Sequence, residues 1–399
     1  MTDILQRLTG KFQNSYHTSP SFIARAPGRV NLLGEHVDYN DGWVLPAAID
    51  RAAYVAVGEC DSPLVSLSAM DLDDGAVFRT TELDAKVDVT GKPLTSWAHY
   101  PAGVGWALKA RGLAVAGMDA VLTADVPRGA GVSSSAAVEV AFATAWQKLG
   151  GWLLNPMDLA LTCQRAENQY VGVNSGIMDQ FASACGRAGH ALLLDCRTLE
   201  WEPVPLPEGV AIVVADTMVR RELGKSEYNV RRAHCEEAVR VLAEVLPGIK
   251  ALRDVPAEDF NRHAQRLSPI VAKRARHVVE ECARVQTAVS ALRASRVAEF
   301  GALMIECHAS LRDLYEVSCP ELNAMVKAAQ KIEGCYGARL TGAGFGGCTV
   351  NLVVSSAADD FRRELAIQYE KAIGKQPEIY VCRASQGAEI LDADASGRG

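Results

Sequence analysis

The sequence lacks several features that would direct it to a membrane, to nucleic acid or to a structural metal. It contains no run of about 18 apolar residues, so we expect no membrane-spanning helix. Its 41 lysines and arginines are outnumbered by 48 aspartates and glutamates, and the net charge of −7 offers no basic patch for nucleic acid. The eight histidines are dispersed, without the H-E-x-x-H or Cys/His clusters that bind zinc.

The eleven cysteines do not follow the pattern of a disulfide framework. They are odd in number and scattered, and no two of them form a C-x-x-C pair. We therefore expect reduced, mostly buried thiols and a cytoplasmic protein. The first residues, "MTDILQRLTGKF", predict a short amphipathic helix and do not resemble a secretory signal.

The 399 residues are 49% hydrophobic, which is enough for two lobes with cores of their own. Strands are predicted at residues 21–26, 52–59, 64–69, 120–126, 190–197, 210–217, 337–344, 347–355 and 378–385. Helices are predicted at residues 96–112, 134–150 and 155–171, within 226–331, and at 357–374. Strands and helices do not alternate strictly, so we expect a mixed α+β fold. A boundary near Pro203 to Gly209 would divide the chain into residues 1–205 and 206–399.

The first of two glycine-rich stretches is "VPRGAGVSSSAAVEVAF", in which a predicted strand, a glycine turn and a helix follow one another. This order presents unpaired backbone N–H groups and the positive end of a helix to an anion. An ordinary serine N-cap would give the same letters, and both interpretations stay open from this stretch alone. It is not a Walker A loop, and the chain has no protein-kinase catalytic loop or D-F-G motif.

The second stretch, "LTGAGFGGCTVNLVV", satisfies G-x-G-x-x-G at Gly342, Gly344 and Gly347. A dinucleotide-binding turn requires a helix directly after these glycines, whereas the following residues are β-branched and strand-like. A β-hairpin is therefore the preferred interpretation, and a dinucleotide-dependent oxidoreductase is the hypothesis to be tested against it.

Five segments in order along the chain carry a family resemblance: "PGRVNLLGEHVDYNDG", "PRGAGVSSSAA", "GIMDQF", "SEYNVRR" and "LTGAGFGG". Together they resemble the galactokinase branch of the GHMP small-molecule kinases, from about Ala24 to the final strand. The second and fifth segments are similar to those of mevalonate and homoserine kinases. The first segment and "SEYNVRR" resemble those of sugar kinases alone.

The resemblance implies a two-lobed GHMP kinase fold with the ligands in the cleft between the lobes. The N-terminal lobe would resemble domain 2 of ribosomal protein S5, and the C-terminal lobe would be a second α+β unit. The sugar-binding residues that it implies are Glu35, His36, Val37, Asp38, Gly176 and Tyr228. Among these, Val37 is expected to point away from its neighbours if the segment is extended.

The resemblance also implies the catalytic and nucleotide-binding residues. Asp179 would face the C1 hydroxyl of the sugar as general base, and Arg29 would lie between that carboxylate and the transferred phosphoryl group. Ser135 and Glu167 would hold Mg²⁺, and Trp97 would border the nucleotide base. The residues implied around the ATP phosphates are Gly129, Ala130, Gly131, Val132, Ser133, Ser134 and Ser135.

The activity so implied is phosphorylation of D-galactose by ATP at its anomeric O1, which gives α-D-galactose 1-phosphate and ADP. The same chemistry on N-acetylgalactosamine, galacturonate or arabinose stays open, as does a non-catalytic sensor of galactose and ATP. The intact serine run and Asp179 favour catalysis over sensing. Expected partners are galactose and ATP, without nucleic acid or membrane, and we expect a monomer or a weak homo-oligomer.

Overall fold

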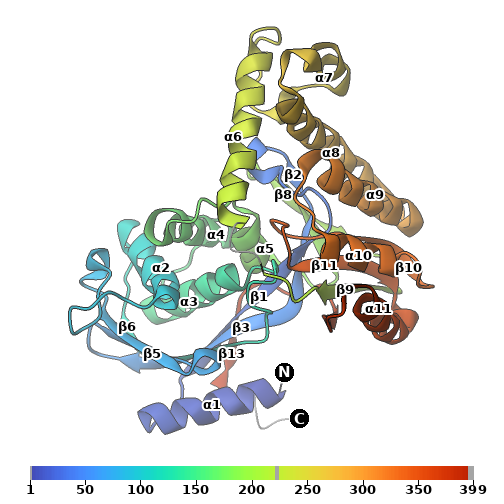
Figure 1. Ribbon diagram of the computed structural model, residues 1–399. Coiled ribbons are helices and arrows are strands. Elements are labelled where there is room, and N and C mark those ends of the chain that lie inside the picture. The colour runs from blue at the N-terminus through green and yellow to red at the C-terminus, as the bar shows by residue number, and fades with distance from the viewer. Residues whose placement is uncertain (1, 221–223, 394–399) are drawn as a thin grey trace.

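The computed structural model describes residues 2–220 and 224–393, which form three sheets surrounded by helices (Figure 1). The helices are α1 (Thr2–Tyr16), α2 (His99–Ala110), α3 (Ser134–Gly150), α4 (Pro156–Arg165), α5 (Met178–Cys185), α6 (Gly224–Ala243), α7 (Ala257–His263), α8 (Pro269–Arg293), α9 (Val297–Ser310), α10 (Pro320–Ala329) and α11 (Ala358–Ile373). The strands are β1 (Phe22–Asn31), β2 (Trp43–Val44), β3 (Pro46–Cys60), β4 (Leu64–Ala69), β5 (Asp74–Arg79), β6 (Gly117–Ala124), β7 (His190–Asp195), β8 (Trp201–Pro205), β9 (Val210–Asp216), β10 (Cys335–Leu340), β11 (Cys348–Val354), β12 (Glu378–Cys382) and β13 (Glu389–Asp392).

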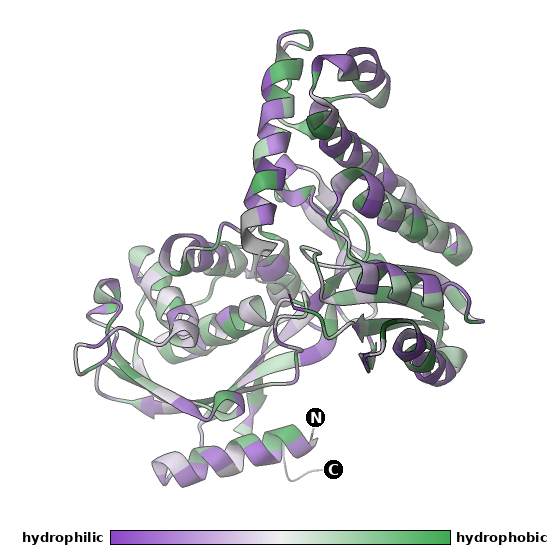
Figure 2. Cartoon of the chain, in the orientation of Figure 1, coloured by the Kyte–Doolittle hydropathy of each residue, from purple (hydrophilic) through white to green (hydrophobic). Residues whose placement is uncertain are grey.

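The N-terminal lobe is built on a six-stranded sheet with the strand order β13-β1-β3-β6-β4-β5. Its outer face is covered by α1, whose apolar residues Ile4, Leu5, Leu8 and Phe12 recur at helical spacing and are buried. Hydrophilic and hydrophobic residues accordingly mix along this helix (Figure 2). The inner face is covered by α3, an alanine-rich helix buried over most of its length. Because both faces are covered, every residue of β1 is buried.

The C-terminal lobe contains the antiparallel sheet β10-β11-β9-β12, with α10 and α11 packed against it. The helices α6, α8 and α9 extend from this lobe, and α6 and α9 each pack against α8 (Figure 1). Ser268 caps α8 by accepting a bond from the backbone N–H of Val271, and Pro269 occupies the first turn. A third, small sheet, β2-β7-β8, lies between these parts of the chain.

The structure confirms the mixed α+β class and the predicted helices and strands, with boundaries shifted by a few residues. The strand β11 directly follows the second glycine stretch, so the dinucleotide-binding hypothesis is wrong. The predicted break near Pro203 to Gly209 covers the end of β8 and the turn that leads to β9. However, β13 from the end of the chain pairs with β1, so the first sheet draws on both ends of the sequence. In the part of the chain that is described, no helix is long and apolar enough to cross a bilayer.

Candidate active site

A cavity of about 280 Å³ gathers most of the predicted functional residues into one place. The predicted residues that line it are Arg29, Glu35, His36, Asp38, Glu167, Gly176, Asp179 and Tyr228. They come from β1 and the loop after it, from the turn that follows α4, from the segment before α5 and α5 itself, and from α6. Residues nearly 200 positions apart in the sequence therefore face a single volume.

Arg29 and Asp179 form an ion pair at the floor of this cavity. Both Nε and Nη2 of Arg29 donate to Oδ1 of Asp179, at 2.8 and 2.6 Å, while Nη1 donates to the carbonyl of Gly131 at 2.6 Å. Arg29 is buried, whereas the Asp179 side chain keeps 27% of its surface exposed. The guanidinium thus connects the carboxylate to the first glycine loop, and Oδ2 of Asp179 remains for a ligand.

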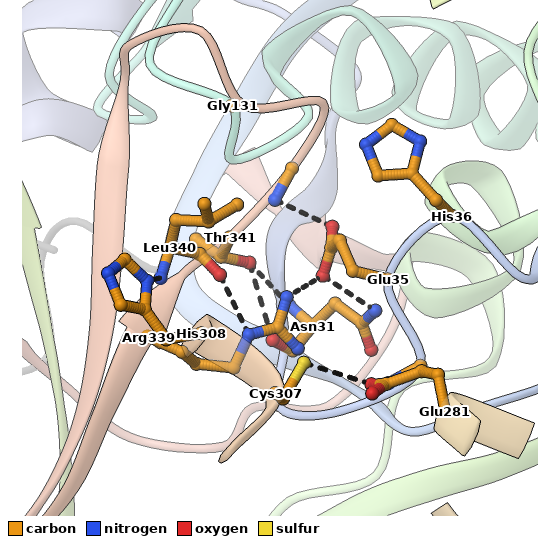
Figure 3. Close-up of polar contacts among 12 residues, drawn as sticks. Asn31, Glu35, His36, Gly131, Glu281, Cys307, His308, Arg339, Leu340 and Thr341 are labelled. Atoms are coloured by element: carbon orange, nitrogen blue, oxygen red, sulfur yellow. Dashed lines mark hydrogen bonds and ion pairs between the residues drawn. The ribbon is translucent and has the colours of Figure 1, made fainter. Parts of the chain in front are cut away.

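Glu35 lines the cavity together with Gly342 and Ala343 of the C-terminal lobe, and Figure 3 shows its polar contacts. Its carboxylate accepts hydrogen bonds from Asn31 Nδ2 at 2.9 Å and from the Gly342 backbone N–H at 2.7 Å, and it forms an ion pair with Arg339. Burial raises the pKa of Glu35, and the guanidinium of Arg339 offsets part of this rise.

The two ring nitrogens of His36 are both bonded to protein groups. Nε2 lies 3.2 Å from the carbonyl oxygen of Ala343, which can only accept, so Nε2 carries the proton. Nδ1 therefore accepts from the hydroxyl of Tyr39 at 2.8 Å. Burial lowers the pKa of His36 to about 3, which keeps the ring neutral. The ring borders the cavity with both nitrogens bonded to protein groups, and the hydrogen bond of His36 to the sugar stays a prediction.

Asp38 and Gly176 face each other across the cavity wall. A Cβ atom on Gly176 would overlap the carboxylate of Asp38, so any larger residue here would displace that carboxylate. Burial raises the pKa of Asp38 to about 6, and the nearby Asp179 carboxylate adds to the rise. The carboxylates of Asp38 and Asp179 both line the same cavity.

Val37 and Tyr228 differ in where their side chains lie. Val37 is fully buried in the hydrophobic core, so its side chain points away from the cavity, and its place among the sugar-binding residues stays a prediction. The loop is not extended here, so its side chain packs inward while Asp38 faces the cavity. Tyr228 lines the cavity, with its ring 5.6 Å from that of His36.

The two glycine-rich stretches meet backbone to backbone beside this cavity. A Cβ atom on Gly342 would lie 2.8 Å from the carbonyl oxygen of Gly131, and one on Gly347 would lie 2.7 Å from that of Ala130. All three glycines have positive φ angles. The close approach explains why both stretches are rich in glycine, which neither interpretation from sequence had included.

The first stretch ends at the N-terminus of α3 in a form suited to an anion. Ser133 precedes the helix with φ of 61° and makes no side-chain cap, so the first N–H groups of α3 are free of a side-chain acceptor. Its Oγ is buried without a partner in the described structure. The side chains of Ala130 and Val132 are fully buried, so these two residues offer only their backbones.

Two hydroxyl groups lie against the carboxylate of Glu167, one from Ser135 and one from Ser175. The Ser135 hydroxyl donates to Oε1 of Glu167 at 3.3 Å, and the Ser175 hydroxyl donates to Oε2. One carboxylate with two hydroxyls is an oxygen donor set that would fit Mg²⁺. Within residues 2–220 and 224–393, no cluster of three or more His, Cys, Asp or Glu side chains forms a metal cage of protein groups.

Trp97 lies away from the cavity lining. It belongs to a short helical turn before α2, and its indole N–H donates to Asp74 of β5 at 2.7 Å. Its role beside the nucleotide base stays a prediction.

Sequence reasoning missed several residues that the structure places at the site. The cavity is also lined by Asn174, Ser175, Asn229, Gly342 and Ala343. Asn229 follows Tyr228 directly, and Ser175 precedes Gly176, so proximity to predicted residues was the available signal. For Gly342 and Ala343 the only signal was the glycine density of the second stretch, because their contacts cross from the other lobe.

Comparison with known proteins places these features in a family. Residues 10–59 match the galactokinase galactose-binding signature, and residues 99–187 and 288–371 match the N-terminal and C-terminal domains of GHMP kinases. Among curated proteins, a galactokinase of Roseiflexus sp. (strain RS-1) is 49% identical over 96% of this chain and 97% of its own. A galactokinase of Chloroflexus aggregans is 45% identical over 98% of both chains.

Solved structures agree with this placement. Galactokinase from Lactococcus lactis, solved in complex with galactose, matches with a TM-score of 0.90 and 34% identity over 97% of this chain and 99% of its own. The mevalonate kinase of Methanococcus jannaschii matches with a TM-score of 0.64 over 91% of this chain and 98% of its own, at 18% identity, and so shares the fold.

Proposed function

This chain belongs to the galactokinase family of GHMP kinases, and from that membership we propose that it phosphorylates D-galactose. ATP supplies the phosphoryl group, and the products are α-D-galactose 1-phosphate and ADP. The observation that carries the proposal is the bridge made by Arg29, which bonds both Asp179 and the Gly131 carbonyl. One guanidinium thereby joins the cavity that takes the sugar to the loop that takes phosphate.

Asp179 accepts the proton of the O1 hydroxyl as O1 attacks the γ-phosphorus. Its Oδ1 is held by two donors from Arg29, so its Oδ2 faces the hydroxyl in a fixed orientation. Arg29 stabilises the negative charge that develops on the transferred group. Since phosphoryl transfer needs mainly positioning and charge stabilisation, this pair supplies much of what the protein contributes.

Glu35, Asp38, the Gly176 backbone and Tyr228 orient the sugar. Glu35 offers an acceptor oxygen to a hydroxyl donor, and Tyr228 can donate or accept. A hexose that lacks the matching hydroxyl leaves such a buried group unpaired, which is the physical basis of its rejection.

The first glycine loop binds the phosphates of ATP, and Ser135 with Glu167 would hold Mg²⁺. The unpaired Oγ of Ser133 and the open N-terminus of α3 fit phosphate oxygens. When bound, Mg²⁺ neutralises charge on the phosphate oxygens. Ser175 orients Glu167 through its hydrogen bond. The free state of the cysteines within the described residues suits a reducing cytoplasm.

The test is ATP turnover with Mg²⁺ on galactose, glucose, N-acetylgalactosamine, galacturonate and arabinose, with the product located by phosphorus NMR. We expect galactose to be preferred, with phosphate on O1. Activity confined to another sugar would overturn the specificity and keep the mechanism. Binding of galactose and ATP without turnover would instead indicate a sensor.

Replacing the base separates catalysis from binding. For Asp179→Asn we expect turnover to fall by at least about 100-fold, because the amide cannot take the proton. Galactose binding, measured by calorimetry, should change far less, since Arg29 can still bond the amide oxygen. Asp61→Asn, at an exposed position, serves as the matched control. Unchanged turnover in Asp179→Asn would remove Asp179 from the role of base.

A further inference from the structure

Arg339 reaches from the C-terminal lobe to the carboxylate of Glu35 without touching the cavity. It lies on β10, and its side chain has no exposed surface. Its Nη2 forms the ion pair with Oε2 of Glu35, and its Nε donates to the Leu340 carbonyl at 2.7 Å (Figure 3). The guanidinium plane is therefore fixed from two sides.

The bonds made by Glu35 leave little of its carboxylate for a ligand. An ionised carboxylate has two oxygens with about four acceptor positions and no donor. Three are occupied by Asn31 Nδ2, Arg339 Nη2 and the Gly342 N–H. Since Glu35 also lines the cavity, a single acceptor position remains for one hydroxyl donor.

Of the two buried carboxylates near Arg339, Glu35 is the one that depends on it for an ion pair. The other buried carboxylate nearby, Glu281, has its own ion pair with Arg284 and accepts from the Gly34 N–H at 2.8 Å. Cys307 donates to Glu281 as well, at 3.0 Å. Without Arg339, Glu35 would be a buried charge with only neutral donors, and it would protonate or turn toward water.

We propose that Arg339 is a positioning residue that sets which one hydroxyl of the sugar the Glu35 carboxylate selects. The inference rests on the proposed function, since it concerns the same sugar pocket. It gives the arginine before the second glycine stretch a part in sugar selection, although it makes no contact with the sugar. The Gly342 N–H serves the same carboxylate from the same stretch.

The experiment measures binding rather than turnover. Calorimetry gives the dissociation constants of galactose and of its monodeoxy derivatives at C2, C3, C4 and C6. In the unmodified protein each deoxy sugar binds more weakly than galactose, and we call this loss of affinity its penalty. The penalty that disappears in Glu35→Gln is the one that depends on Glu35. For Arg339→Met we expect galactose to bind roughly 10- to 100-fold more weakly. The penalty identified with Glu35→Gln should vanish, while the other three remain.

Two further variants keep the test decisive. Arg25→Met removes another buried arginine, paired with Glu389 on β13 and away from the cavity, and should leave all four penalties unchanged. Arg339→Lys retains the charge without the planar fork, and should lose the same single penalty in part. If Arg339→Met does not fold, Arg339→Lys alone decides.

The outcomes separate this inference from the proposed function. A uniform weakening of all sugars in a folded Arg339 variant, or penalties identical to those of the unmodified protein, would overturn the positioning role. Failure of the unmodified protein to bind galactose would overturn the proposed function and this inference with it. Selective loss of one penalty supports both.

Discussion

Gly176 shapes the sugar pocket by having no side chain. Its Cα faces the Asp38 carboxylate so closely that any Cβ would displace it. For Gly176→Ala we expect the galactose KM to rise by roughly tenfold or more, because Asp38 would be displaced from the hydroxyl that we propose it bonds. The KM for ATP should change little, since the glycine lies on the sugar side. Steady-state kinetics with each substrate varied separately make the measurement.

The matched control is Gly10→Ala. Gly10 lies within α1, and a Cβ there meets nothing within 4 Å, so neither KM should change. An unaltered galactose KM in Gly176→Ala would show that Asp38 is free to move without cost, and would count against its role in holding the sugar.

His36 shows what residue types alone do not reveal. A histidine between two acidic residues was a reasonable candidate for a sugar contact, and the cavity does include it. Its hydrogen bonds, however, go to Tyr39 and to the Ala343 carbonyl. Tyr39 is three residues away, but Ala343 comes from the other lobe. The use of a side chain thus depends on long-range contacts that no local pattern contains.

In the loop before α3, the contribution of the Ser133 hydroxyl to ATP binding can be separated from its contribution to stability. Ser133 Oγ is buried without a partner in the described structure, so its loss costs the unliganded protein little. For Ser133→Ala we expect the free energy of unfolding to change by less than about 1 kcal/mol. The dissociation constant of ATP should rise by roughly threefold to tenfold, because a phosphate oxygen loses a donor.

Thr144→Val provides the comparison within the same helix. Its hydroxyl bonds the Val140 carbonyl at 2.8 Å, well inside α3, so ATP binding should be unaffected. A large loss of stability in Ser133→Ala with unchanged ATP binding would mean that the hydroxyl is structural, and would contradict its place in the phosphate site.

The longer helices were predictable from sequence, whereas some of the short strands were not. The predicted helices at 134–150 and 357–374 correspond to α3 and α11 because their periodicity extends over several turns. The strands β2, β8 and β13 span two, five and four residues, too few for alternation to stand out. Such strands exist because a partner strand lies beside them, and the partner is set by the fold.

The two lobes are joined more intimately than a single boundary in the sequence suggests. The loop after β1 is held by the C-terminal lobe, through the bond from Gly342 to Glu35 and that from His277 of α8 to the Glu35 carbonyl. Gly34 permits the turn, since a Cβ there would lie 2.5 Å from the Trp43 carbonyl oxygen. The predicted division at 205/206 therefore describes the chain order, while the sugar pocket is assembled from both halves.

Buried histidines at this join make the stability of the molecule depend on pH. Burial lowers the pKa of His36 to about 3 and those of His277 and His308 to about 4, whereas the unfolded chain has a value near 6.5. Below pH 6.5 the unfolded chain binds protons that the folded protein excludes. The free energy of unfolding therefore decreases as the pH is lowered. The raised pKa of Asp38, about 6, opposes part of this fall because the folded state binds its proton first.

Over the range from pH 7.5 to pH 5.5 we expect the three histidines to lower the free energy of unfolding by about 4 kcal/mol, as measured by urea denaturation. The buried carboxyls Asp38, Glu35, Glu139 and Glu167, whose pKa values burial raises, offset part of this fall. Glu281, whose pKa burial would raise but Arg284 lowers to about 2, adds a further loss of stability only below about pH 4.5.

His277→Asn should reduce the decrease in the free energy of unfolding by about 1 kcal/mol, because one of the three histidines is removed. His17→Asn, at an exposed position after α1, should retain the full slope. Equal pH dependence of stability in the His277 and His17 variants would show that His277 also binds its proton in the folded protein. The hydrogen bond to the Glu35 carbonyl would then come from a charged imidazolium and not from a neutral ring.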